Sequence, residues 1–241
     1  MSTPSSPSSY FSPPLLVFYD LETTGLDVDK DLILEIGAIC PYSRHWNPHR
    51  APAKKEDENP AMFPRFRQVC IPPQELVEAR GIDLTKIFTP LLREQVNRDT
   101  LVNDCFRTYH NRTPSTKESL CDFFEWLRSL VRATQTSRLV LIAHNGEKFD
   151  KPMLLQNVDS TGVCLVDRVL LSHITFADSL PVIQQYLKRS NGNSLTKLKQ
   201  EYLKPDDPLR TDDTLAHEAL ADVCSLIQVL ENMGVKREDF L

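Results

Sequence analysis

Two short and unbroken apolar segments constrain the fold of this chain more than any other feature. Residues 15–19 (LLVFY) and 139–143 (LVLIA) show no alternation between polar and apolar positions. A strand with one solvated face alternates, so an unbroken run predicts a strand that is buried on both faces. Such strands belong to sheets that carry helices on both sides. The two segments therefore predict an α/β protein.

Three more segments predict strands of the same sheet. Residues 32–39 follow the first apolar segment closely, which predicts an antiparallel hairpin. Residues 66–71 form a third strand that ends at two prolines, and residues 174–177 form a short fifth strand. Together with the strand at 139–143, these segments predict a mixed five-stranded central sheet.

Helices are predicted between and after the later strands. The clearest begins at Ser115, because Ser115 and Glu118 have the spacing of a capping box and apolar residues then recur every three or four positions. The alternation of helices and strands predicts helices on the faces of the sheet. Further helices are expected from about residues 152, 180 and 194, and over 215–233.

The domain organisation is predicted from composition. Residues 1–14 are rich in Ser and Pro, which predicts a disordered tail. Residues 15–241 are expected to form a single domain, since this length is ordinary for one hydrophobic core with insertions. A proline-rich segment at about 41–65 contains the charged run KKEDE and is expected to be an exposed insertion.

Charge and cysteine usage limit the classes of partner and compartment. The formal net charge is -5, whereas proteins that grip long stretches of nucleic acid are usually basic. A nucleic acid partner would therefore have to be held locally, with metal ions supplying positive charge. Six well-separated cysteines and the absence of a secretory pattern at residue 1 predict an intracellular protein, cytoplasmic or nuclear. No apolar run reaches the roughly 20 residues that a membrane span needs.

Two acids follow the first strand at a spacing that places them together. Asp20 and Glu22 are two residues apart, and residues i and i+2 of a strand point to the same face. Two neighbouring carboxylates repel each other, and a divalent cation such as Mg²⁺ or Mn²⁺ offsets that repulsion. The plainer explanation is that both acids cap the turn at residues 23–25. The D-x-E pair alone does not separate these alternatives.

Three later residues favour the metal explanation. Asp150 follows the fourth strand, where it would otherwise serve as a helix N-cap, and Asp222 lies among small residues of the last helix. The carboxyl ends of neighbouring strands form the sites of α/β proteins. His217 lies five residues before Asp222, which is about 140° of rotation on an ideal helix. We therefore expect His217 on the first turn or the preceding loop, as a candidate general base.

Three segments resemble the motifs of a known superfamily. YDLETTGL at 19–26, AHNGEKFD at 143–150 and HEALAD at 217–222 resemble the DEDDh (DnaQ-like) 3′→5′ exonucleases, in the same order. Within that superfamily, the chain looks most similar to the three-prime repair exonuclease (TREX) group and to the related exonuclease-like domain of PML and PML-like proteins. The resemblance implies a ribonuclease-H-like fold and two Mg²⁺ or Mn²⁺ ions. It implies His217 as the base and four metal carboxylates: Asp20, Glu22, Asp150 and Asp222.

The resemblance also implies a set of substrate-binding residues. Thr23, Thr24 and Leu26 match positions that hold the 3′-terminal nucleotide, with Leu26 as an apolar wedge against a base. Asn145 matches a position that lines the substrate groove, and Phe149, four residues later in the same motif, is a further substrate-binding candidate. Four lysines near these motifs are candidates for balancing phosphate charge, although each also fits an ordinary solvated surface: Lys148, Lys151, Lys197 and Lys199.

The function that follows is a hydrolase that removes 3′-terminal nucleotides from DNA. We expect a preference for single-stranded ends and release of nucleoside 5′-monophosphates. Two alternatives stay open: an RNA exonuclease of the same superfamily, and a non-catalytic module that keeps the fold for nucleic-acid binding or interaction. All five acid and base positions are present in the sequence, which favours an enzyme. TREX-group enzymes are dimeric, so a homodimer is the arrangement to test.

Overall fold

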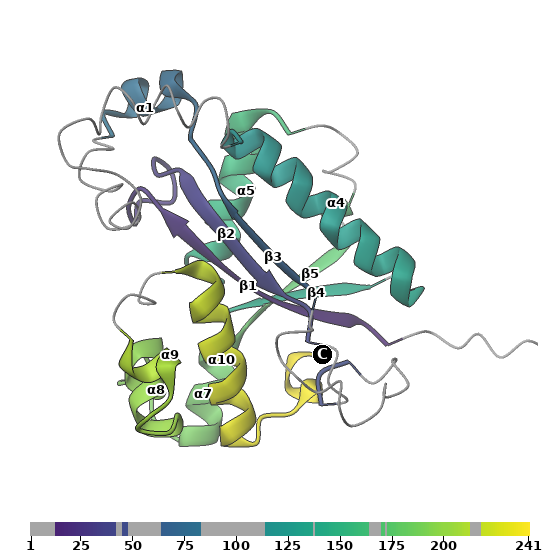
Figure 1. The fold of residues 1–241 in the computed structure, drawn as a ribbon, viewed down its shortest axis with the longest axis vertical. Coiled ribbons are helices and arrows are strands. Elements are labelled where there is room, and N and C mark those ends of the chain that lie inside the picture. The colour runs from purple at the N-terminus through teal and green to yellow at the C-terminus, as the bar shows by residue number, and fades with distance from the viewer. Residues whose placement is uncertain are drawn as a thin grey trace, which may run out of the picture.

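A mixed five-stranded sheet forms the centre of the molecule (Figure 1). The computed structural model describes residues 13–41, 45–47, 64–82, 114–136, 138–163, 170–171, 173–212 and 218–241. The strand order is β3-β2-β1-β4-β5, in which β1 pairs antiparallel with β2 and parallel with β4. This confirms the predicted sheet. The strands are β1 (Leu15–Thr23), β2 (Ile33–Ile39), β3 (Arg65–Val69), β4 (Leu139–Ala143) and β5 (Ile174–Asp178).

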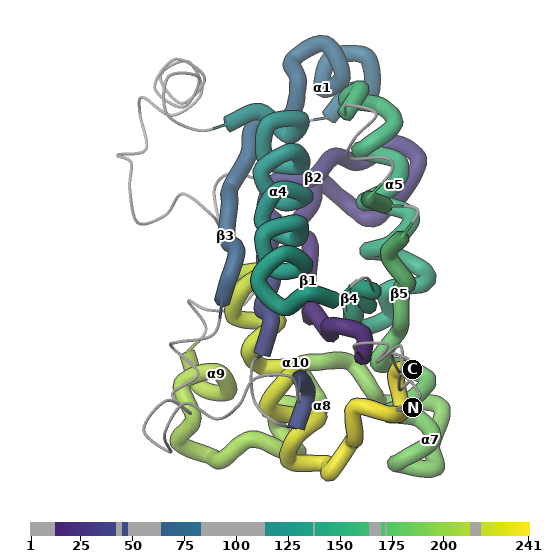
Figure 2. Tube along the Cα trace, turned by 90° about the vertical axis from the view of Figure 1, so that its right-hand side faces the viewer, coloured from purple at the N-terminus to yellow at the C-terminus, as the bar shows by residue number. Residues whose placement is uncertain are grey.

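Helices cover both faces of the sheet (Figures 1 and 2). One face packs against α4 (Thr116–Thr134) and α5 (Asp150–Thr161), and α4 begins at the predicted Ser115–Glu118 capping box. The opposite face packs against α7 (Ser179–Leu187), α8 (Leu195–Tyr202) and α10 (Ala219–Met233). No helix in the described ranges is long and apolar enough to cross a membrane. The shorter elements are α1 (Gln74–Arg80), α9 (Pro208–Thr211) and the 3₁₀ turn η4 (Arg237–Phe240).

The alternation of side chains along β1 creates two separate cores. Val17 and Tyr19 pack into the core beneath α4 and α5, whereas Leu16 and Phe18 pack into the core beneath α10. Because successive strand residues point to opposite faces, position 20 continues the second set. The strand therefore delivers its first acid, Asp20, to the face that α10 covers.

Gly37 allows α10 to sit directly on this face. It is the cross-strand partner of Asp20 in the β1–β2 pair. A Cβ atom at position 37 would lie 2.5 Å from the backbone of Ala219 and Leu220, at the start of α10. Backbone cannot yield as a flexible side chain does, so only glycine fits at this contact. The first turn of α10 therefore packs directly against the backbone of β2, at the position beside Asp20.

Replacing Gly37 with Ala is expected to separate α10 from the sheet and to weaken binding at the metal site that the sequence predicts around Asp20. Overpacking of this kind costs about 1–3 kcal/mol of the free energy of unfolding. We expect the thermal midpoint to fall and the affinity for Mn²⁺ to fall at least about tenfold, both measurable by calorimetry. An unchanged midpoint together with unchanged Mn²⁺ affinity would contradict the assigned role of this contact.

The proline-rich segment differs in part from its predicted exposure. Residues 45–47 lie within it, and Trp46 is fully buried against the edge of Phe18, with ring centroids 5.0 Å apart. The indole Nε1 donates to Glu231 Oε1 at 2.8 Å. Burial of a large aromatic side chain is strongly favourable, so Trp46 packs into the core although the surrounding sequence is rich in proline. The other residues between 42 and 63, and the tail at 1–12, lie outside the described residues.

Candidate metal and active site

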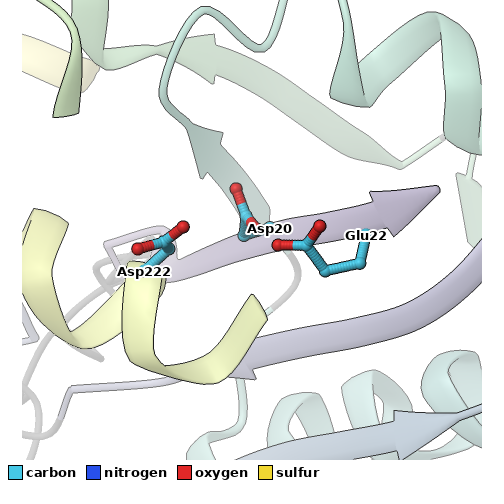
Figure 3. A group of neighbouring side chains, drawn as sticks. All are labelled: Asp20, Glu22 and Asp222. Carbon is cyan, nitrogen blue, oxygen red and sulfur yellow. The ribbon is translucent and has the colours of Figure 1, made fainter. Parts of the chain in front are cut away.

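Three carboxylates from two elements converge at the carboxyl end of β1. Asp20 and Glu22 project from the strand, and Asp222 reaches them from the first turn of α10 (Figure 3). One oxygen of each group lies within 4.8 Å of the others. The i, i+2 spacing put the two strand acids on one face as predicted, and the contact of α10 with Gly37 brings Asp222 to them.

Asp150 is a fourth carboxylate near the other three, because its charge raises the pKa of both Asp20 and Glu22. It is the first residue of α5, and the N-cap position belongs to Phe149, so Asp150 does not cap the helix as the plainer explanation held. Its side chain is 2% exposed. Its Oδ1 atom has no hydrogen-bond partner within the described ranges. A buried and unsatisfied carboxylate oxygen is costly, and a bound cation is one way to compensate it.

Burial and mutual repulsion raise the pKa of each strand acid. The pKa of Asp20 is raised well above its ordinary value, first by burial and then by the charges of Asp150 and Glu22. The pKa of Glu22 is raised to about 8, first by burial and then by Asp222. Burial likewise raises the pKa of Asp150 to about 7. Hard oxygen donors in this number suit Mg²⁺ or Mn²⁺, whose charge would favour the ionised forms. The donor set therefore fits the expected metal.

These raised pKa values predict that the metal-free protein loses stability as the pH rises. Glu22 has an ordinary pKa of 4.5 and a folded pKa of about 8, so the folded state binds more protons than the unfolded chain between those values. Stability is then full below pH 4.5 and decreases through pH 8. We expect the metal-free midpoint to be lower at pH 8.5 than at pH 5.5 by roughly 10 °C.

Thermal unfolding with and without Mn²⁺ checks this prediction. Mn²⁺ should raise the midpoint more at pH 8.5 than at pH 5.5, because the carboxylates must be ionised to bind it. Glu22→Gln is the control, since it removes one titrating group and should flatten the pH dependence. A midpoint that depends on neither pH nor Mn²⁺ would contradict the prediction.

The turn after β1 is held by its own side chains. Thr24 Oγ1 donates to Asp31 Oδ1 at 2.6 Å and accepts from the backbone N of Leu32 at 3.0 Å. Thr23 Oγ1 donates to the carbonyl of Gly25 at 2.6 Å. These bonds close the turn without the carboxylates of Asp20 and Glu22. The plainer explanation for the two acids, that they cap the turn, is therefore wrong.

Leu26 stands at the tip of this turn with its side chain in solvent. It is 84% exposed, the largest value among the exposed large hydrophobic residues of the described chain. An isolated exposed leucine is ordinary on a protein surface. Its position beside Thr23 and Thr24, one turn from the carboxylates, is consistent with the substrate role that the motif implied.

A loop after β4 places Asn145 at the same edge of the sheet. Asn145 has a positive φ of 62°, which non-glycine residues adopt rarely. Asp178, at the end of β5, accepts from the backbone N of Asn145 at 2.9 Å and of Glu147 at 3.2 Å. It also caps α7 through the N of Leu180 at 2.8 Å. Asp178 therefore fixes the conformation of the loop that carries Asn145.

The other predicted residues are placed as follows. Phe149 is partly buried and packs against the core beneath α4 and α5. Lys199 approaches the site, with its Nζ 3.7 Å from Asp222 Oδ1, whereas Lys151 pairs with Glu147 at 2.7 Å. Lys148 and Lys197 are exposed. His217 lies outside the described residues, and its role stays a prediction.

Sequence reasoning missed three charged residues around the site: Asp178, Glu35 and Arg67. Asp178 had a readable signal, because an acid at the end of a predicted strand and just before a helix is typical of an N-cap. Glu35 is fully buried on β2 and accepts from Arg67 Nε at 2.7 Å. A single acid within a strand pattern gives no such signal, since its partner is 32 residues away.

The arrangement of sheet and helices defines a ribonuclease-H-like fold. No protein-family model and no curated protein sequence matches the chain. Among solved structures, the chain is similar to Exonuclease I of E. coli in complex with a dA16 oligonucleotide, with a TM-score of 0.51 and 15% sequence identity. The match covers 94% of this chain and 42% of the E. coli protein. At this identity the comparison shows the fold, and the chain spans less than half of its neighbour.

Proposed function

We propose that this chain is a metal-dependent 3′→5′ exonuclease that acts on DNA and prefers single-stranded ends. The observation that carries the proposal is the convergence of Asp20, Glu22 and Asp222 within 4.8 Å, with the buried Asp150 adjoining Asp20. Four buried or half-buried acids in one place destabilise a fold unless they serve a cation. Phosphodiester hydrolysis is a chemistry that such a cation site supports.

Two further observations support the proposal. The similar solved structure is an exonuclease that holds a DNA oligonucleotide, dA16. The sequence also contains all three motifs that resemble the DEDDh superfamily. Its segments HNGEKFDKPMLL and FADSLPVIQQY, together with the last helix, look most like the TREX group. These likenesses favour DNA over RNA.

Each residue has a definite role in the proposed reaction. Asp20, Glu22 and Asp222 would hold one Mg²⁺ or Mn²⁺ ion, and Asp150 would hold a second together with Asp20. Bound metal supplies charge neutralisation at the phosphate and at the leaving oxygen. His217, neutral near pH 7, takes a proton from the attacking water. The product is a nucleoside 5′-monophosphate.

The turn after β1 and the loop after β4 would hold the 3′-terminal nucleotide. Thr23 and Thr24 lie in a turn that the hydrogen bonds of Thr24 with Asp31 and Leu32 keep closed, which would fix the turn against the nucleotide. Leu26 would press on a base from its exposed position, and Asn145 would line the groove. Contact with a few terminal nucleotides needs little positive charge, so the net charge of -5 is compatible with this mode of binding. Lys148, exposed in the same loop, would meet a phosphate.

A labelled-oligonucleotide assay tests the proposal directly. Matched single- and double-stranded DNA and RNA, labelled at the 5′ end, are incubated with Mg²⁺, with Mn²⁺ or with EDTA. We expect a ladder that shortens from the 3′ end of single-stranded DNA, and no shortening in EDTA. Faster shortening of RNA would favour the RNA exonuclease. Binding of DNA without any cleavage would favour the non-catalytic module.

A further inference from the structure

Arg67 connects the buried side of the site to the start of α10. It projects from edge strand β3, where it lies opposite Gly37 in the β2–β3 pair. Its Nε donates to Glu35 Oε1 at 2.7 Å, and its Nη1 lies 3.4 Å from Glu218 Oε2. One guanidinium thus joins a carboxylate of the sheet to a carboxylate of the helix terminus.

The first of these carboxylates, Glu35, belongs to the floor of the site. It is the cross-strand partner of Glu22, so both side chains point to the face beneath α10. Its side chain is fully buried. A buried carboxylate needs a positive partner, and Arg67 supplies it. The buried carboxylate of Glu35 therefore orients the guanidinium of Arg67.

The second carboxylate, Glu218, belongs to the N-cap residue of α10. Its side chain makes no cap hydrogen bond to its own helix and pairs with Arg67 instead. Its carbonyl accepts from the backbone N of Asp222 at 3.0 Å, which closes the first turn of α10. A shift of Glu218 would therefore move the backbone of Asp222, because one hydrogen-bonded turn joins the two residues.

We propose that Arg67 is a positioning residue for the nuclease reaction, acting through Glu218. Glu35 orients the guanidinium, the guanidinium holds the N-cap, and the N-cap sets the first turn that carries Asp222. In the sequence, Glu218 also directly follows His217, the expected base. The proposal deepens the proposed function and rests on it. It assigns a reaction role to a side chain that touches neither metal nor substrate.

The geometry separates this role from a contribution to stability alone. The Arg67–Glu35 bond satisfies Oε1 of the buried carboxylate, whereas its Oε2 has no hydrogen-bond partner within the described ranges. The Arg67–Glu218 contact joins side chains that are 43% and 30% exposed. An ion pair with this exposure adds little to the free energy of unfolding. Loss of the Glu218 contact should therefore change the reaction while leaving the thermal midpoint nearly unchanged.

Two conservative variants and their combination test the proposal. Glu218→Gln keeps the buried pair and removes only the helix end of the bridge. Arg67→Lys keeps a positive charge at Glu35, but a single ammonium does not span two carboxylates as a guanidinium does. We expect each variant to lower kcat about tenfold on 5′-labelled single-stranded DNA, with KM unchanged. The double variant should fall about tenfold and not hundredfold, because both changes break one bridge.

Amide hydrogen exchange gives a readout that does not depend on activity. Exchange at Asp222 should become about tenfold faster in both single variants, since its N–H bond to Glu218 closes the first turn. Arg65→Lys is the matched control. It makes the same exchange two residues earlier on the same face of β3, and kcat and exchange should match the unaltered protein.

The outcomes separate failure of this inference from failure of the proposed function. If the unaltered protein cleaves DNA but Glu218→Gln has normal kcat and normal exchange, only the positioning role is wrong. Multiplicative effects in the double variant would also overturn it. If the unaltered protein does not cleave, the proposed function is wrong, and the exchange at Asp222 alone decides whether Arg67 holds the helix.

Discussion

Asp20→Asn should abolish metal-dependent shortening of DNA while leaving the metal-free protein more stable than before. Asp20 faces Glu22 and Asp222, and charges from both these residues and Asp150 act on it. The substitution keeps the shape of the side chain and removes one of the charges that repel. Loss of metal coordination should lower the rate by at least about 10³-fold, the equivalent of the several kcal/mol that a bound metal contributes to the transition state.

Opposite changes in activity and stability make this prediction specific. A misfolded variant loses both cleavage activity and thermal stability. A variant that lacks only a metal ligand loses the activity, but its metal-free form becomes more stable. The thermal midpoint in EDTA at pH 8 should rise, and the increase on adding Mn²⁺ should disappear. Asp29→Asn is the control, because Asp29 is an exposed acid of the following turn. Undiminished cleavage by Asp20→Asn would show that the site has been assigned wrongly.

His217→Ala should lower kcat by about 10²–10⁴-fold, the range that general base catalysis contributes. Binding of single-stranded DNA, followed by fluorescence anisotropy in Ca²⁺, should change little, because a base acts on the attacking water and not on the nucleotide. Added imidazole should restore part of the rate to this variant. A loss of binding as large as the loss of rate would argue for a contact with substrate instead.

The pH dependence of the rate of the unaltered protein tests the same assignment from another direction. A histidine accepts a proton only when it is neutral, and its ordinary pKa is about 6.5. The rate at saturating metal should therefore rise with pH below roughly 6.5 and reach a plateau above it. A profile that stays flat from pH 5.5 to pH 8 excludes histidine as the base.

The sheet was predictable because local pattern and burial agree along each strand. Residues 15–19 and 139–143 are unbroken apolar runs, and both strands are buried on both faces. The alternation of side chains along β1 correctly predicted that Asp20 and Glu22 point to the same face of the sheet. The capping box at Ser115 likewise marked the start of α4 to the residue, since its reciprocal bonds are local in sequence. These features needed no knowledge of distant parts of the chain.

What escaped prediction depends on contacts between distant residues. Trp46 looked exposed in a proline-rich segment, yet it packs on Phe18 and bonds to Glu231, 185 residues away. Arg67 and Glu35 lie on neighbouring strands, and neither has a local signal that marks it as part of a site.

The contact between Gly37 and α10 bears on how inactive proteins with this fold are recognised. A chain is commonly judged active when its acids and its histidine are all present. Here, one added methyl group at position 37 would meet the backbone of Ala219 and Leu220 and displace Asp222 while every motif stayed intact. Pseudoenzymes of this architecture could thus arise without any change in a catalytic residue. Inspection of the residue that faces the first acid across the hairpin should therefore accompany the motif check.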